Sequence, residues 1–114
     1  MRKFKLVVFT EAHEGQEQEY NDWYTGRHLE DVCALEGFTS AQRFKLHSVT
    51  MGKALNDYMA IYDVETDDPD WVVENLFAKQ DTDAMPISPA LNMDNVNVFL
   101  YEELTEVVKA KDNA

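Results

Sequence analysis

The chain is poor in cysteine, proline and glycine, with one, three and four of them among 114 residues. A single thiol, Cys33, cannot form an intramolecular disulfide, so we expect a reduced setting in which it packs as a small apolar side chain. The glycines are too widely spaced for a G-x-G-x-x-G fingerprint or a P-loop. The sequence therefore gives no support for a nucleotide site.

Basic residues are also scarce, because ten lysines and arginines stand against twenty-two acids and leave a net charge of −12. This charge repels the phosphates of nucleic acids and of anionic lipids. No apolar run reaches membrane-spanning length, and Met1-Arg2-Lys3 leads directly into a strand-like segment. We expect a cytoplasmic protein with no nucleic-acid or membrane partner.

The length and composition of the chain are typical of one globular domain, which we expect over residues 1–108, followed by a frayed tail over 109–114. The hydrophobic periodicity predicts strands over 4–10, 38–47, 57–65 and 95–103, a helix over 16–35 and a second helix starting at 68–70. In that start Asp68 is the expected cap and Pro69 the first helical residue. The order βαββαβ predicts an α+β, ferredoxin-like fold, with a four-stranded antiparallel sheet and two helices on one face.

The strand patterns also predict which residues face the core. Tyr58 and Tyr62 share one face of their strand, and Phe44 and Leu46 are expected to point inward. The first and last strands are apolar on both sides, so the sheet face without helices needs a cover. A second copy of the chain is the simplest cover, which predicts a homodimer.

One helix carries residues suited to acid–base chemistry. Tyr24, His28 and Asp31 are spaced so that their side chains can meet on one helix face, together with Arg27. Asp31 is expected to orient His28, His28 to move a proton, and Tyr24 to donate to a developing oxyanion. The alternative is that His28 is packed in place and Asp31 only holds Arg27.

Other sites have weaker signals. His13 and His47 lie in other segments, so we expect no metal site and no cofactor, and a lone histidine does not favour haem. Trp23, Gln42, Arg43 and Tyr62 are expected binding residues, although packing or a surface ion pair would also explain them. The connection 81–92 contains Pro86 and Pro89 and is long, which indicates a functional or interface role.

The stretch YNDWYTGRHLEDVCALEGFTSAQRF (residues 20–44) resembles the EthD-like proteins of the dimeric α/β-barrel superfamily. The positions that carry the resemblance are Trp23, His28, Gly37, Phe38, Ala41, Arg43 and Phe44, whereas Glu36 stands where many relatives have proline. The resemblance implies a ferredoxin-like protomer, a homodimeric barrel and a cleft between sheet and helices. It implies no single activity, since such proteins include oxygenases, cyclases, isomerases and lyases, but it points to His28 as the position to carry over.

The leading hypothesis is a cofactor-independent enzyme that isomerises, cyclises or eliminates from a small, mostly apolar, aromatic or polyketide-like metabolite, as in the catabolism of aromatic compounds. Two alternatives stay open. The chain can be a non-catalytic homodimer that binds a small molecule or serves as an accessory subunit, or it can be a cofactor-free monooxygenase that consumes oxygen with its substrate.

Overall fold

The computed structural model describes residues 1–112, so residues 113 and 114 of the predicted tail lie outside the described part. The elements are strand β1 (Arg2–Thr10), helix α1 (Glu17–Trp23), π-helix η1 (Tyr24–His28), helix α2 (Leu29–Cys33), strands β2 (Phe38–Lys45) and β3 (Tyr58–Thr66), helix α3 (Pro69–Lys79), a short 3₁₀ helix η2 (Met93–Asn95) and strand β4 (Asn97–Glu102). No predicted strand or helix end differs from these by more than two residues.

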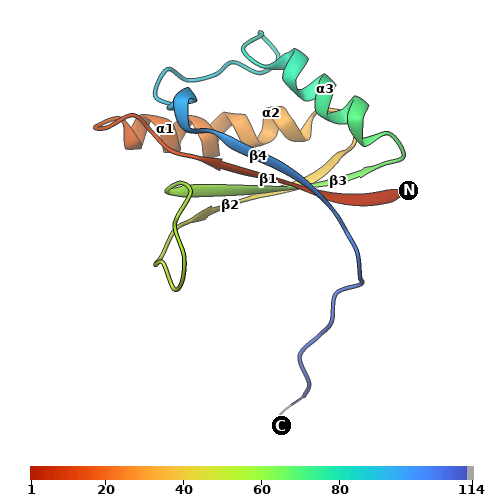
Figure 1. Ribbon diagram of the computed structural model, residues 1–114. Helices are drawn as coiled ribbons and strands as arrows, with labels where there is room; N and C mark the ends of the chain where they lie inside the picture. The colour runs from red at the N-terminus through yellow and green to blue at the C-terminus, as the bar shows by residue number, and fades with distance from the viewer. Residues whose placement is uncertain (113–114) are drawn as a thin grey trace.

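The four strands form one antiparallel sheet in the order β2-β3-β1-β4, and the helices cover one of its faces (Figure 1). This confirms the predicted α+β, ferredoxin-like architecture. The helices of this single layer come from the two β-α-β halves, whose connections return on the same side of the sheet. The other face is left without a helix.

The first helix is continuous from α1 through η1 to α2, but its middle turn is wider than an α-helix. The Leu29 N–H donates to the Tyr24 carbonyl, a bond between residues five apart instead of four. An insertion of this kind shifts the phase of everything that follows it, and such π-turns are frequent at functional sites.

Helix α3 begins as its sequence predicts. The Asp68 side chain accepts a hydrogen bond from the Trp71 N–H (3.2 Å), and Pro69 occupies the first turn, where its missing N–H costs nothing. Val72 and Leu76 are buried against the sheet. The cap thus fixes where the chain turns from β3 into the helix layer.

The core lies between the helices and the covered sheet face. Its buried strand residues alternate along β1 and β3, and Tyr58 and Tyr62 share this face as predicted. The buried apolar residues are Phe4, Leu6, Tyr20, Tyr24, Val32, Phe38, Tyr58, Ala60, Tyr62, Val64, Val72, Leu76, Met85, Ala90 and Leu91.

The predicted inward face of β2 is wrong. A bulge between Phe38 and Ser40 shifts the register against β3, so that Phe38 stays in the core while Phe44 pairs opposite Met59 on the uncovered face. Phe44 is 38% exposed and Leu46 is 41% exposed. One extra residue in a strand exchanges its two faces, which the alternation pattern alone could not reveal.

The uncovered face is largely apolar in its centre, where β1, β3 and β4 contribute Val7, Phe9, Ile61 and Phe99. Phe9 and Phe99 pack edge to face with their ring centroids 6.1 Å apart. Figure 1 shows every helix on the opposite side of the sheet. Within residues 1–112, no helix is long and apolar enough to cross a membrane.

Candidate functional site

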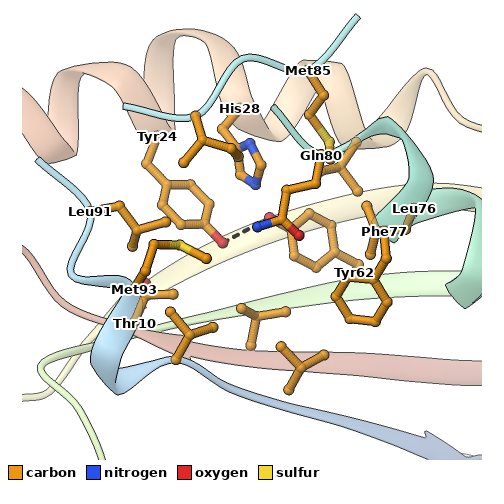
Figure 2. A pocket seen from close by; sticks show the side chains of 15 residues that line it. Thr10, Tyr24, His28, Tyr62, Leu76, Phe77, Gln80, Met85, Leu91 and Met93 are labelled. Carbon is orange, nitrogen blue, oxygen red and sulfur yellow. Dashed lines mark hydrogen bonds between the residues drawn. The ribbon is translucent and has the colours of Figure 1, made fainter. Parts of the chain in front are cut away.

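A cavity of about 70 Å³ lies between the first helix, α3, the covered sheet face and the connecting segment, residues 80–92. Figure 2 shows its side chains converging from all four parts. The lining is mostly apolar, with polar groups from Thr10, Tyr24, His28, Tyr62 and Gln80 among Val8, Val32, Leu76, Phe77, Met85, Ile87, Leu91, Met93, Val96 and Val98. Few polar groups in an apolar lining are typical of small-molecule sites.

His28 lines this cavity from the last residue of the π-helix η1. In a regular α-helix Trp23 and His28, five residues apart, would lie about 140° apart around the axis. Here their rings stack with centroids 4.6 Å apart, and the Tyr24 ring meets His28 edge-on at 4.8 Å. Tyr24, His28 and Val32, each four residues after the last, therefore line the cavity together.

Arg27, which was expected on this face, is exposed at the surface instead and pairs there with Asp31.

Burial controls the charge of His28. Its pKa is lowered from 6.5 to about 4, mainly because burial penalises the imidazolium; the Asp31 charge raises the pKa in part, and the Arg43 cation adds a smaller lowering. His28 is therefore neutral near pH 7. Its Nδ1 atom is buried and has no hydrogen-bond partner within residues 1–112.

Two tyrosine hydroxyls meet at the floor of the cavity. The hydroxyl groups of Tyr24 and Tyr62 are 2.9 Å apart and share one hydrogen bond, drawn as a dashed line in Figure 2. Burial raises the pKa of Tyr24 to about 12 and raises that of Tyr62 further, so both stay protonated at neutral pH. One of the two hydroxyl groups donates the hydrogen bond that they share, so the O–H of the other remains able to donate to a bound molecule.

The expected bond between Asp31 and His28 is not formed. Asp31 accepts a hydrogen bond from Arg27 Nε at 3.0 Å, and within residues 1–112 no hydrogen bond joins it to the imidazole. The Arg27–Asp31 pair is the i, i+4 pair that the spacing also allowed. Asp31 thus acts on His28 only through its charge.

Trp23 lies behind His28 and does not line the cavity. Its Nε1–H donates to the Pro86 carbonyl at 3.0 Å, which ties the first helix to the connecting segment. The indole therefore supports the imidazole from one side and fixes the segment that closes the cavity from the other.

The structure places the remaining two expected binding residues elsewhere. Arg43 stacks over the rings of Tyr20, Tyr24 and Tyr58, with its guanidinium carbon 4.4 Å from the Tyr24 centroid, and donates to Thr25. It holds the aromatic layer under the helix as a cation on ring faces. Gln42 is exposed on the uncovered face, on the far side of the sheet from the cavity.

Several lining residues were missed by the sequence analysis. Gln80, which follows α3, lines the cavity, and Met85 and Leu91 line it from the connecting segment. Phe77 and Met93 line it and are 49% and 52% exposed, so both side chains also reach the surface. The one available signal was the length of this proline-containing connection.

Within residues 1–112, no group of three or more histidine, cysteine, aspartate or glutamate side chains is placed to hold a metal ion.

No protein-family model matches the sequence, and no curated protein matches it. Solved structures do. An ethyl tert-butyl ether D (EthD) family protein from Bacillus halodurans is 12% identical over 90% of this chain and 99% of its own, with a TM-score of 0.54. The haem-degrader MhuD from Mycobacterium tuberculosis, with two haems in its active site, is 17% identical over 92% of this chain and 99% of its own, with a TM-score of 0.57.

A second MhuD structure, of a variant holding two manganese protoporphyrins per active site, gives the same TM-score of 0.57 at 16% identity over 94% of this chain and 99% of its own. These likenesses confirm the expected structural resemblance to EthD proteins. The chain has the protomer fold of the dimeric α/β-barrel proteins, a fold that includes enzymes. At such identities the likeness shows the fold and not the activity.

Proposed function

We propose that this protein, with the protomer fold of the dimeric α/β barrels, is a cofactor-independent enzyme of isomerase, cyclase or lyase type acting on a small aromatic or polyketide-like carbonyl compound. The observation that supports it best is the meeting of His28 with the Tyr24–Tyr62 hydroxyl pair at one apolar cavity. A base beside a hydroxyl donor is the arrangement that proton abstraction next to a carbonyl requires.

The two groups have complementary tasks. A tyrosine with a pKa of about 12 stays protonated and can donate to the oxygen of a developing enolate, in a site where water does not compete. His28 is neutral and can accept the proton from carbon, and the enolate charge then favours its cationic form. Because burial lowers its pKa to about 4, it is a weak base suited to C–H bonds already acidified by a carbonyl.

The size of the cavity limits the guest. A cavity of about 70 Å³ is about half of the roughly 150 Å³ that holds a benzene ring, so it has room for a carbonyl group with a few neighbouring carbon atoms. The rest of the substrate would then extend out of the cavity past Phe77 and Met93, whose apolar side chains are partly exposed. We therefore expect the reacting carbonyl to enter first, towards Tyr24.

Haem does not fit this site as it stands. The cavity of about 70 Å³ is far below the roughly 300–1,000 Å³ of sites for drug-sized ligands, and haem is larger than most of these.

The test is exchange of carbon-bound protons. A panel of small enolisable aryl ketones, α-tetralone among them, is incubated with the protein in D₂O and followed by NMR. His28→Gln is expected to slow the exchange about 10²–10⁴-fold, and Tyr24→Phe to slow it less, with unchanged circular dichroism. Exchange that is equal in wild type and His28→Gln would refute the assigned base.

The same samples separate the alternatives. Binding of the ketones, seen by saturation transfer, without exchange in any sample would favour a non-catalytic binding or accessory protein. Oxygen uptake that requires the ketone would favour a cofactor-free monooxygenase.

The acting form is proposed to be a homodimer that pairs through the uncovered faces. The apolar centre of that face, from Val7 to Phe99, is the part that gains most from being covered. Light scattering at micromolar concentration is expected to give about twice the 13.2 kDa of one chain. A mass of one chain would refute the pairing.

A further inference from the structure

Arg43 carries a positive charge that no carboxylate neutralises. Its guanidinium lies over the rings of Tyr20, Tyr24 and Tyr58 and donates from Nη1 to the neutral hydroxyl of Thr25 at 2.9 Å. In the described part of the chain, no carboxylate oxygen lies within 4.0 Å of it, although the sequence has twenty-two acidic residues. Its Nη2 atom is buried and has no hydrogen-bond partner in the same part of the chain.

The contacts of this cation are with neutral groups. Residues 37–56, which include its strand, contain no acid. The carboxylate of Glu17 accepts its hydrogen bond from the Tyr58 hydroxyl, at 2.9 Å. Ring faces attract a cation through their quadrupole, but they carry no net charge that would cancel its field. The positive potential of Arg43 therefore extends into the core, where a low effective dielectric weakens it less than water does.

Tyr24 links this charge to the cavity. The guanidinium carbon lies 4.4 Å from the centre of the Tyr24 ring, and Tyr24 lines the cavity and shares its hydroxyl hydrogen bond with Tyr62. Tyr24 is 2% exposed, so its ring is shielded from water that would screen the charge. Burial is the largest influence on the pKa values of Tyr24, Tyr62 and His28, and the Arg43 charge acts on each as a smaller lowering. The charge thus acts on all three of these groups.

We propose that Arg43 is a positioning residue of the reaction proposed above: it holds the Tyr24 ring in place, and its charge stabilises the oxyanion that develops beside the Tyr24 hydroxyl. This inference rests on the proposed function. In the step concerned, the proton moves from carbon to His28 and the electron pair of the C–H bond stays in the enolate. The substrate carbonyl is neutral and the enolate is negative, so the attraction to Arg43 grows as the proton leaves carbon.

The same charge has an opposite effect on the base. A nearby cation disfavours the protonated form of His28, which makes the imidazole a weaker proton acceptor. Arg43 contacts the ring of Tyr24, the residue that binds the oxyanion, and its effect on His28 is smaller than those of burial and Asp31. We therefore expect that removing the charge slows the reaction, whereas an effect on the base alone would accelerate it.

Exchange of carbon-bound protons in Arg43→Met tests this sign. Methionine keeps a long apolar side chain against the rings and removes the charge. With the enolisable ketones, kcat is expected to fall about tenfold or more while KM changes little, because the charge acts on the enolate and not on the neutral ketone. Exchange in Arg43→Met that is as fast as in the wild type, or faster, would overturn the inference.

Two further variants separate charge from shape. Lys45→Met removes the same charge from an exposed residue two positions further along β2, and it is expected to leave kcat and KM unchanged. Arg43→Lys keeps the charge and is expected to retain more of the rate than Arg43→Met. Equal losses of rate in Arg43→Lys and Arg43→Met would show that only the shape of the side chain matters, and would overturn the inference.

A second measurement needs no turnover and separates this inference from the proposed function. Acetate and acetamide have nearly the same shape and are both smaller than a benzene ring, but only acetate is negative at pH 7. Their dissociation constants are measured by NMR titration of the His28 ring protons in the wild type, Arg43→Met and Lys45→Met. The Kd of acetate relative to that of acetamide is expected to rise about tenfold in Arg43→Met and to stay within about twofold in Lys45→Met.

The two measurements can fail separately. Equal ratios in the wild type and Arg43→Met, or acetate bound no more tightly by the wild type, would overturn the role of Arg43 even if the wild type exchanges protons. A tenfold change in the ratio without proton exchange in any of the proteins would refute the proposed function alone, and would assign the Arg43 charge to anion binding at the cavity.

Discussion

The buried hydrogen bond between Tyr24 and Tyr62 allows a quantitative test of the site. The two side chains are 2% and 1% exposed and their hydroxyls are 2.9 Å apart. Tyr24→Phe keeps the ring that packs under Arg43 but leaves the Tyr62 hydroxyl buried without its partner. The cost of such an orphaned group is about 1–3 kcal/mol of unfolding free energy.

The double variant is the informative one. Tyr62→Phe alone is expected to cost about as much as Tyr24→Phe, because it orphans the other hydroxyl. Removing both hydroxyls leaves no unpaired polar group, so the double variant should lose clearly less than the sum of the two single losses. The expected coupling is about 1–2 kcal/mol.

Urea unfolding of the four proteins, followed by circular dichroism, gives these free energies. Tyr101→Phe is the control, since Tyr101 is 59% exposed on β4, and its effect is expected to stay within about 0.5 kcal/mol. Single losses that add in the double variant would show that the hydroxyls do not depend on each other and would refute the assignment of a shared bond.

Two further predictions concern pH and the backbone. The pKa of His28 is lowered from 6.5 to about 4 in the folded chain, so the imidazole of the unfolded chain is protonated first as the pH falls. The free energy of unfolding is therefore highest above about pH 6.5 and decreases between about pH 6.5 and 4, by up to about 3 kcal/mol. Urea titrations of wild type and His28→Gln should therefore diverge in that window only, and parallel curves would contradict the buried neutral imidazole. Gly37→Ala is expected to lower the unfolding free energy by at least about 1–2 kcal/mol, since Gly37 has φ of +97° and a Cβ there would lie 2.8 Å from Val72 Cγ2. Urea unfolding measures this loss, and Gly26→Ala, where a Cβ meets nothing within 4 Å, is the matched control that is expected to be neutral or slightly stabilising.

Much of the fold could be predicted because its signals are local. The cap at Asp68 and the proline after it fixed the start of α3, and the alternation along β3 placed Tyr58 and Tyr62 together. The one wrong face, that of β2, came from a bulge at Phe38 and Ser40. A bulge depends on the partner strand, so the strand's own pattern does not contain it.

The candidate site was predicted only in part. The spacing of four residues predicted that the side chains of Tyr24 and His28 meet, and both line the cavity, as proton transfer by His28 would require. It also suggested Asp31 as the partner of His28, but the neighbouring Arg27 takes that carboxylate. Gln80, Met85 and Met93 reach the cavity from segments distant in sequence, where no spacing rule applies.

The sequence by itself determined the order of elements, the aromatic core and the helix that carries His28, because hydrophobic period, caps and turns act over a few neighbouring residues. Only the tertiary structure decided that His28 faces a cavity and that Tyr62 completes the pair with Tyr24. Both depend on the packing of segments that are remote in sequence, whose free energy belongs to the assembled layers and not to any one stretch of chain.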